Sequence, residues 1–210
     1  DGNPLALSIL TPEDFELPPG GLNIRWPDPL MNQEMRLHRY AVKAAQAFAR
    51  ANRIDRMVLD APDARFGIVT TGKSYLDVLQ ALEYLGLDAQ RCRELGIRVY
   101  KIGMTWPLEP LGIRAFARGL RDILVVEEKH AFIESQMKEL FYNFEGDRPS
   151  IVGKYDEDGQ WILPSTGELT PATIAGVIAR RLQKFVPEGS RDTEHIREVL
   201  RWMEQKEGEL

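Results

Sequence analysis

The 210-residue chain has one cysteine, three histidines and no apolar run as long as a membrane span. A single thiol, Cys92, cannot form an internal disulfide, and an iron–sulfur cluster needs several more thiolates. The histidines, His38, His130 and His195, are too scattered to suggest a zinc site. We therefore expect no metal site and no membrane contact, and the lone thiol favours a reducing, cytoplasmic location.

Acidic residues also outnumber basic ones. The chain has 27 Lys and Arg against 32 Asp and Glu, which gives a net charge of -5. This balance repels the phosphate backbone, so we expect no nucleic-acid partner. With 43% hydrophobic and 28% charged residues the chain is typical of a globular protein. It begins at Asp1 without an initiator methionine, so we expect it to be a piece of a longer protein.

Prolines concentrate at the start of the chain, where six of the thirteen fall within the first 30 residues. Proline fixes φ and removes a donor, so we predict an extended arm over residues 1–30 that lies on another element. Residues 31–52 have the spacing of an amphipathic helix with a basic face, which is either solvated or docked on an acidic neighbour. We divide the remainder into an α/β domain, which includes this helix and covers residues 31–187, and a charged helix at 188–210.

Short β-like runs alternate with helical patterns through the middle of the chain. Strands are predicted at 56–60, 65–71, 97–102, 123–126 and 150–153, and helices at 74–85, 89–95, 110–118, 132–141, 170–182 and 192–206. Parallel neighbouring strands need crossover connections, so this alternation of strands and helices predicts a three-layer α/β/α fold with a mostly parallel sheet.

Residues Gly67–Ser74 match the phosphate-loop pattern G-x-x-x-x-G-K-[ST]. Its four middle residues, 68–71, are all β-branched and indicate a strand instead of a loop. On that interpretation Gly72 and Lys73 form a plain turn, and Ser74 caps the following helix. The alternative, a nucleotide-binding module that uses Gly67–Ser74, stays open.

A weaker form of the phosphate-binding hypothesis also remains. In it, Thr70, Thr71, Gly72 and Ser74 are candidates for holding an anionic group of a cofactor at a helix N-terminus. Glu127 is a further candidate, because it follows a buried strand at the edge where open α/β sheets bind ligands. The favoured interpretation is structural: we expect one of Glu127 and its neighbour at 128 to be solvated and the other to pair with a nearby Lys or Arg. No catalytic residue is predicted.

Three ordered blocks, Phe66–Leu87, Leu95–Pro110 and Asp122–Asn143, closely resemble indolepyruvate ferredoxin oxidoreductase. They resemble the domain of that enzyme that is similar to the transketolase C-terminal domain. The resemblance implies a mixed sheet of five strands with one antiparallel, for which Arg56–Asp60 is the candidate. It also implies that the domain positions the catalytic domains and builds a subunit interface.

The family's enzyme uses thiamine diphosphate with Mg and iron–sulfur clusters to decarboxylate arylpyruvates, and passes electrons to ferredoxin. The resemblance therefore implies an oxidoreductase parent whose other domains or subunits are the partners of this chain. None of the family's thiamine-binding residues has a matching position here, so we expect the isolated fragment to bind no cofactor and to be inactive. We also expect Trp106 and the proline-rich arm to present apolar surface to partner domains.

Overall fold

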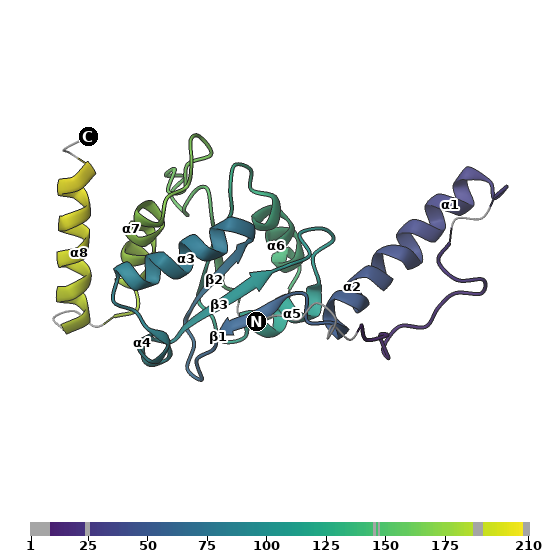
Figure 1. The fold of residues 1–210 in the computed structure, drawn as a ribbon, viewed down its shortest axis with the longest axis horizontal. Coiled ribbons are helices and arrows are strands. Elements are labelled where there is room, and N and C mark those ends of the chain that lie inside the picture. The colour runs from purple at the N-terminus through teal and green to yellow at the C-terminus, as the bar shows by residue number, and fades with distance from the viewer. Residues whose placement is uncertain (1–8, 24–25, 145, 147, 187–190, 208–210) are drawn as a thin grey trace.

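The computed structural model describes residues 9–23, 26–144, 146, 148–186 and 191–207, and Figure 1 shows the arrangement of its helices and strands. The predicted arm residues 1–8 and 24–25, and residues 188–190 and 208–210 of the predicted last helix, lie outside these ranges. The strands are β1 (Arg56–Leu59), β2 (Phe66–Thr71), β3 (Ile97–Ile102), β4 (Asp122–Val126) and β5 (Ser150–Val152). The helices that follow β1 are α3 (Gly72–Tyr84), α4 (Ala89–Leu95), α5 (Pro110–Ala117), α6 (Phe132–Tyr142), α7 (Pro171–Leu182) and α8 (Arg191–Glu207).

The five strands form one mixed sheet in the order β1-β3-β2-β4-β5. Four strands are parallel, and β1 runs antiparallel to β3 with Arg56 opposite Lys101. The mixed five-stranded sheet and the antiparallel strand at its start are therefore confirmed. The sequence did not reveal that β3 is the neighbour of β1.

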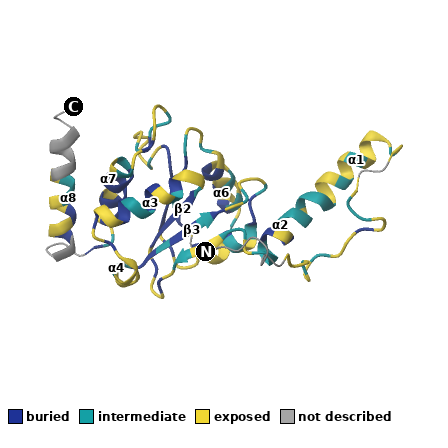
Figure 2. Ribbon diagram, in the orientation of Figure 1, coloured by how far each residue is buried: buried dark blue, intermediate teal, exposed yellow. Residues whose placement is uncertain are grey.

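Alternate residues of the central strands face opposite sides of the sheet, as the period of two requires. Ile68 and Leu124 join a core under α3, α4, α7 and α8, while Val69 and Val125 join a second core under α5 and α6. Figure 2 shows both layers as buried segments around the strands. The fold is thus the expected three-layer α/β/α sandwich.

A buried ion pair joins α7 to the central sheet. Arg181 donates from Nε to Oδ2 of Asp122, at 2.7 Å, and both side chains are almost fully buried. The same guanidinium holds Glu157, in the segment after β5, through Nη1 at 2.6 Å. This contact, with Lys184 adding a second, holds the pKa of Glu157 well below its ordinary range.

The segment before β1 folds as a projecting hairpin, by which we mean the arm from residue 9 together with the long helix from Leu30 to Ala51. The helix comprises α1 (Leu30–Arg36), a π-helical turn η2 (Leu37–Ala41) and α2 (Val42–Ala51), and the π turn was not predicted. The arm runs antiparallel along it, with hydrogen bonds from Asn52 to Leu10, from Arg36 to Gly21 and from Gln33 to Asp28. The predicted arm therefore lies on the chain's own helix (Figure 1).

The root of the projecting hairpin is fixed to the loop between β3 and α5. Arg50 pairs with Glu109, the residue that caps α5, at 2.6 Å. Asp55 accepts the backbone amide of Gly103 at 2.7 Å, and burial raises the pKa of this carboxyl. A Cβ at Gly103 would lie 2.4 Å from the carbonyl oxygen of Ile54, so only glycine fits this approach.

Candidate functional site at the carboxyl edge of the sheet

The carboxyl ends of β2, β3 and β4 meet at one edge of the sheet, where Thr70 lies opposite Val126 and Thr71 opposite Ile102. Helices α3 and α6 begin at the same edge. Ligands of open α/β sheets bind at this edge, beyond the strand ends and near the helix N-termini. All five predicted site residues lie there, so it is the candidate site to test.

The phosphate-loop pattern does not form a loop. Every residue from Phe66 to Thr70 is in register with both β3 and β4, so residues 68–71 belong to the strand as predicted. The predicted helix start at Ser74 is wrong, because α3 begins at Gly72 with Thr71 in the N-cap position. Gly72 makes this abrupt strand-to-helix turn possible by adopting a φ of 53°.

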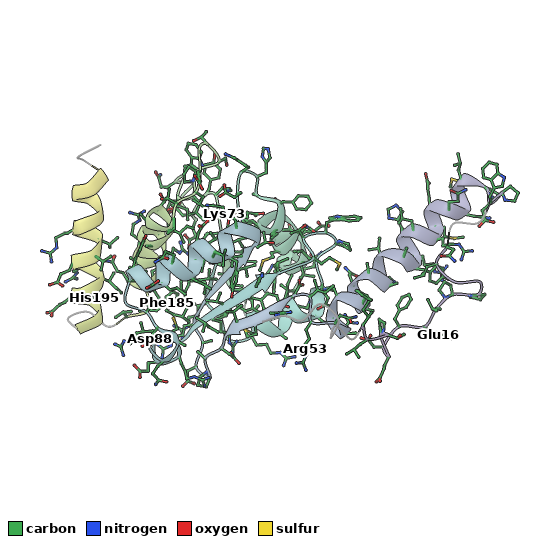
Figure 3. All side chains as sticks on the ribbon, viewed as in Figure 1. Glu16, Arg53, Lys73, Asp88, Phe185 and His195 are labelled. Atoms are coloured by element: carbon green, nitrogen blue, oxygen red, sulfur yellow. The ribbon has the colours of Figure 1, made fainter. Side chains whose placement is uncertain are left out.

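Lys73, labelled in Figure 3, is bound by two carboxylates. Its Nζ lies 2.9 Å from Oδ2 of Asp77 and 2.9 Å from Oε1 of Glu168. Hydrogen bonds to Glu168 and then to Asp77 raise the pKa of the Lys73 ammonium. Two negative side chains against one positive one repel a polyphosphate, so this lysine is not arranged to bind a nucleotide.

The hydroxyls at the start of α3 are turned away from solvent. Thr70 is fully buried and Ser74 is 1% exposed, and neither oxygen has a hydrogen-bond partner among the described residues. The prediction that Ser74 caps the helix is therefore wrong. Thr71 donates its hydroxyl to the carbonyl of Ile102 at 2.9 Å. Of the four predicted residues only Gly72 is exposed, and a Cβ there would meet nothing within 4 Å.

Glu127 is 4% exposed and caps helix α6 from outside the helix. Its carboxylate accepts the backbone amides of Phe132 at 3.0 Å, Ile133 at 2.8 Å and Glu134 at 3.0 Å. Burial raises the pKa of Glu127, and the three amides act in the opposite direction. We expected one of the two acids to pair its carboxylate with a nearby Lys or Arg. Glu127 does not, because its carboxylate binds the positive N-terminal end of a helix.

A buried lysine that the sequence analysis missed completes this edge. Lys154 is 3% exposed and donates from Nζ to the carbonyl oxygen of Glu127, while its backbone amide binds Oε2 of Glu134 at 2.9 Å. Gly153 allows the contact, because a Cβ there would lie 2.3 Å from that carboxylate oxygen. Burial lowers the pKa of Lys154. The only sequence signal is a Gly-Lys pair after a strand, which is too weak to single out.

The residues at this edge do not fit thiamine diphosphate with its metal ion, or an iron–sulfur cluster. Within the ranges that the structure describes, no group of three or more His, Cys, Asp or Glu side chains is placed to hold a metal ion. The carboxylates of Glu127 and Glu134 are committed to backbone amides. Cys92 is a fully buried residue of α4, and burial raises the pKa of its thiol to about 11, so it is no metal-binding thiolate.

Exposed aromatic side chains lie beside the filled edge. Trp106 is 58% exposed in the loop before α5, and Phe132 is 50% exposed at the start of α6. The loop is fixed, because Gln136 donates to the carbonyl of Thr105 at 2.9 Å and Gln46 donates to that of Leu108 at 2.8 Å. The exposure of Trp106 agrees with expectation, and this edge presents apolar surface instead of a polar cavity.

Comparisons with known proteins agree with this reading of the fold. A family model described as an indolepyruvate oxidoreductase domain matches residues 56–209. Indolepyruvate oxidoreductase subunit IorA of Pyrococcus abyssi is 32% identical over 126 residues, which is 60% of this chain and 17% of that protein. The IorA subunit of Methanothermobacter marburgensis is 28% identical over 137 residues, or 65% of this chain and 21% of its own.

A solved structure shares the fold at low sequence identity. The 2-oxoglutarate:ferredoxin oxidoreductase from Magnetococcus marinus superposes with a TM-score of 0.50 and 16% identity, covering 75% of this chain and 24% of its own. The chain thus spans about a fifth of the length of the curated relatives that it matches. In the described residues, no helix is long and apolar enough to cross a bilayer.

Proposed function

Because this chain belongs to the indolepyruvate oxidoreductase domain family, we propose that it organises the catalytic domains and the subunit interface of a parent oxidoreductase. The parent would oxidise indolepyruvate or a related arylpyruvate with thiamine diphosphate and Mg, and pass electrons through iron–sulfur clusters to ferredoxin. The chain's own share of that activity is positioning. It would act in the cytoplasm, among the other domains or subunits of the parent.

The observation that carries this proposal is the filled carboxyl edge. Side chains that would hold an anion or a metal in a catalytic domain instead bind the protein itself, as Lys73 and Glu127 do. Exposed apolar side chains, Trp106 and Phe132, lie at the same edge. An edge that offers apolar surface and no free charged cluster is suited to packing against another domain.

We also propose that the chain has three parts with separate roles. Residues 31–187 would supply the positioning domain, with 1–30 and 188–210 as the arm and the charged helix that join it to neighbours. The fixed loop at 103–109 supports this assignment, because Asp55 and Gln136 hold it to the helix root and to α6. A rigid loop that carries an exposed tryptophan presents a preformed contact to a partner.

The test compares the parent enzyme with and without this contact. Trp106→Glu in the full parent should reduce the fraction of enzyme that assembles, while assembled enzyme keeps its turnover of indolepyruvate with a dye acceptor. Tyr142→Glu, at a residue that is 76% exposed at the end of α6, is the matched control and should assemble normally. Far-UV circular dichroism of the isolated 210-residue chain checks that neither change unfolds the domain.

Two results would overturn the proposal. One is a Trp106→Glu parent that assembles and turns over like the wild type. The other is turnover of indolepyruvate by the isolated chain in the presence of thiamine diphosphate and Mg.

A further inference from the structure

The outer part of the projecting hairpin buries none of its helix. No residue of α1 or η2 is buried, although Met31 is 74% exposed and Met35 is 53% exposed. Figure 2 shows this end of the long helix as exposed or half-buried. Most helical stability in proteins comes from tertiary packing of an apolar face, so the outer turns need a further surface to cover them.

Two strongly exposed apolar side chains, Met31 and Met35, lie one turn apart on α1. Leu37, which is 49% exposed, lies on a different face and lines a hollow between the helix and the arm. We call Met31 and Met35 the methionine stripe. Exposed basic residues, Arg39 and Lys43, flank it. An apolar stripe with basic flanks is the pattern of a helix that docks in a groove.

Charge divides the chain into two unlike parts. The helix from Leu30 to Ala51 has four Lys or Arg against one Glu, a net charge of +3. All other residues together have 23 Lys or Arg against 31 Asp or Glu, a net charge of -8. Two such helices repel each other, which disfavours a symmetric pairing of hairpins and favours an acidic surface as the partner.

The chain itself carries such a surface, between β1, α3 and α4. The α3–α4 groove has a volume of about 380 Å³ and an apolar floor that includes Leu59, Leu79, Leu82 and Leu87. Glu83 and Asp88 lie at its rim. A second hollow shares Gly86, Leu87 and Asp88 with the groove, and adds Glu94, Glu194 and Glu198 against Arg91 and His195.

The groove and the methionine stripe lie at opposite ends of the molecule (Figure 1), and Figure 3 places Asp88 and His195 far from the hairpin. A chain cannot dock its own helix in its own groove across this separation. We propose that the methionine stripe of one copy docks in the α3–α4 groove of a second copy. The contact is heterologous, so each copy uses two different surfaces and the assembly closes as a ring or extends as a chain. This inference is independent of the proposed function.

Sedimentation velocity of the 210-residue chain tests the contact over a wide range of concentration, at low and at high salt. We expect self-association that weakens as salt rises, because charge complementarity contributes to it. Met31→Glu with Met35→Glu, or Glu83→Lys with Asp88→Lys, should each raise the dissociation constant about tenfold or more. Leu111→Glu is the matched control, since this residue of α5 is 52% exposed and lies outside both surfaces. It should associate like the wild type.

Mixing the two double variants separates this contact from a symmetric one. The methionine variant keeps an intact groove, and the groove variant keeps an intact stripe. A heterologous contact therefore predicts that the mixture forms complexes of two chains that cannot grow further. Unchanged circular dichroism shows that the variants are folded.

Three outcomes would overturn the inference. The wild-type chain could stay monomeric under all conditions, which would mean that a different partner covers the stripe. The groove variant could associate like the wild type, which would indicate a symmetric contact between hairpins. The mixture of variants could form no dimer.

Discussion

The α/β body and the projecting hairpin differ in how much apolar surface they bury. In the body, strands such as β4 are buried along their whole length, and two cores hold the helices on either face. In the hairpin, the first buried residue of the long helix is Ala47, near its root. The body is stabilised by its own apolar burial, whereas the hairpin is held by hydrogen bonds with its arm and by the Arg50–Asp14 ion pair. On the proposals above, the body is the folding unit and the hairpin is a contact element.

The largest expected effect on stability comes from a leucine-to-alanine substitution, which we compare between the two regions. Leu124→Ala, at a fully buried residue of β4, should lower the free energy of unfolding by about 2–5 kcal/mol, through lost burial and a cavity. Leu30→Ala, at a residue that is 77% exposed in the hairpin, should change it by less than about 0.5 kcal/mol. Urea unfolding followed by circular dichroism measures both. Similar losses at the two positions would contradict the comparison.

A change at the root should loosen the hairpin from the body. In Gly103→Ala the new Cβ would lie 2.4 Å from the carbonyl oxygen of Ile54, which is backbone and cannot easily move aside. We expect a loss of about 1–3 kcal/mol and faster proteolysis of the hairpin than of the body. Thr105→Ala, in the same loop, is the control for the loop itself. If the hairpin of the variant were as resistant to protease as that of the wild type, the close approach of Gly103 to Ile54 would not be what fixes the hairpin to the body.

A smaller, pH-dependent effect is expected within the body, at Glu157. Arg181 and Lys184 hold the pKa of this carboxyl below its ordinary value of 4.5, so the pair stabilises the fold above that pH. The stabilisation is lost as pH falls below 4.5 and the carboxyl becomes protonated. Since Glu157 is 41% exposed, Glu157→Gln should cost about 1 kcal/mol or less at neutral pH.

Thermal unfolding at several pH values measures this dependence. The difference between wild type and Glu157→Gln should shrink as the solution is acidified. The control is Glu139→Gln, at an exposed position of α6, which should follow the wild type throughout. A difference that is independent of pH would mean that the ion pair does not contribute.

The smallest expected effect is no effect. Titration calorimetry of Mg-ATP into the wild type and into Lys73→Ala should detect binding in neither, because Asp77 and Glu168 already neutralise this lysine. Micromolar binding to the wild type that disappears in the variant would restore the nucleotide-binding alternative.

Much of the fold is predictable because local patterns agree with the tertiary structure. The β-branched run at residues 68–71 lies in the centre of the sheet, and Thr170 with Pro171 starts α7 as the capping rule requires. The start of α3 is wrong by two residues because Gly72 turns directly from strand to helix, a geometry that sequence does not specify. The π turn at 37–41 was also not predicted, because its residues are equally compatible with an ordinary α-helical turn.

The candidate site was harder to predict than the fold. Glu127 was placed at the correct edge, but its task depends on the amides of a helix that begins five residues later. Lys154 is buried beside it only because Gly153 lets Glu134 approach, and nothing in the local sequence indicates that contact. The position of a charged residue follows from the strand order, whereas its partners follow from packing that sequence spacing does not encode.

The reversed direction of β1 sets how the molecule would respond to mechanical load. Its first residue, Arg56, lies opposite Lys101 at the carboxyl edge, just after the root of the hairpin. Pulling on the hairpin therefore drags β1 along its own axis. The hydrogen bonds to β3 run across that axis, so they are loaded in shear and share the force instead of opening one by one like a zipper. The hairpin is accordingly tethered in a geometry in which a short edge strand resists tension.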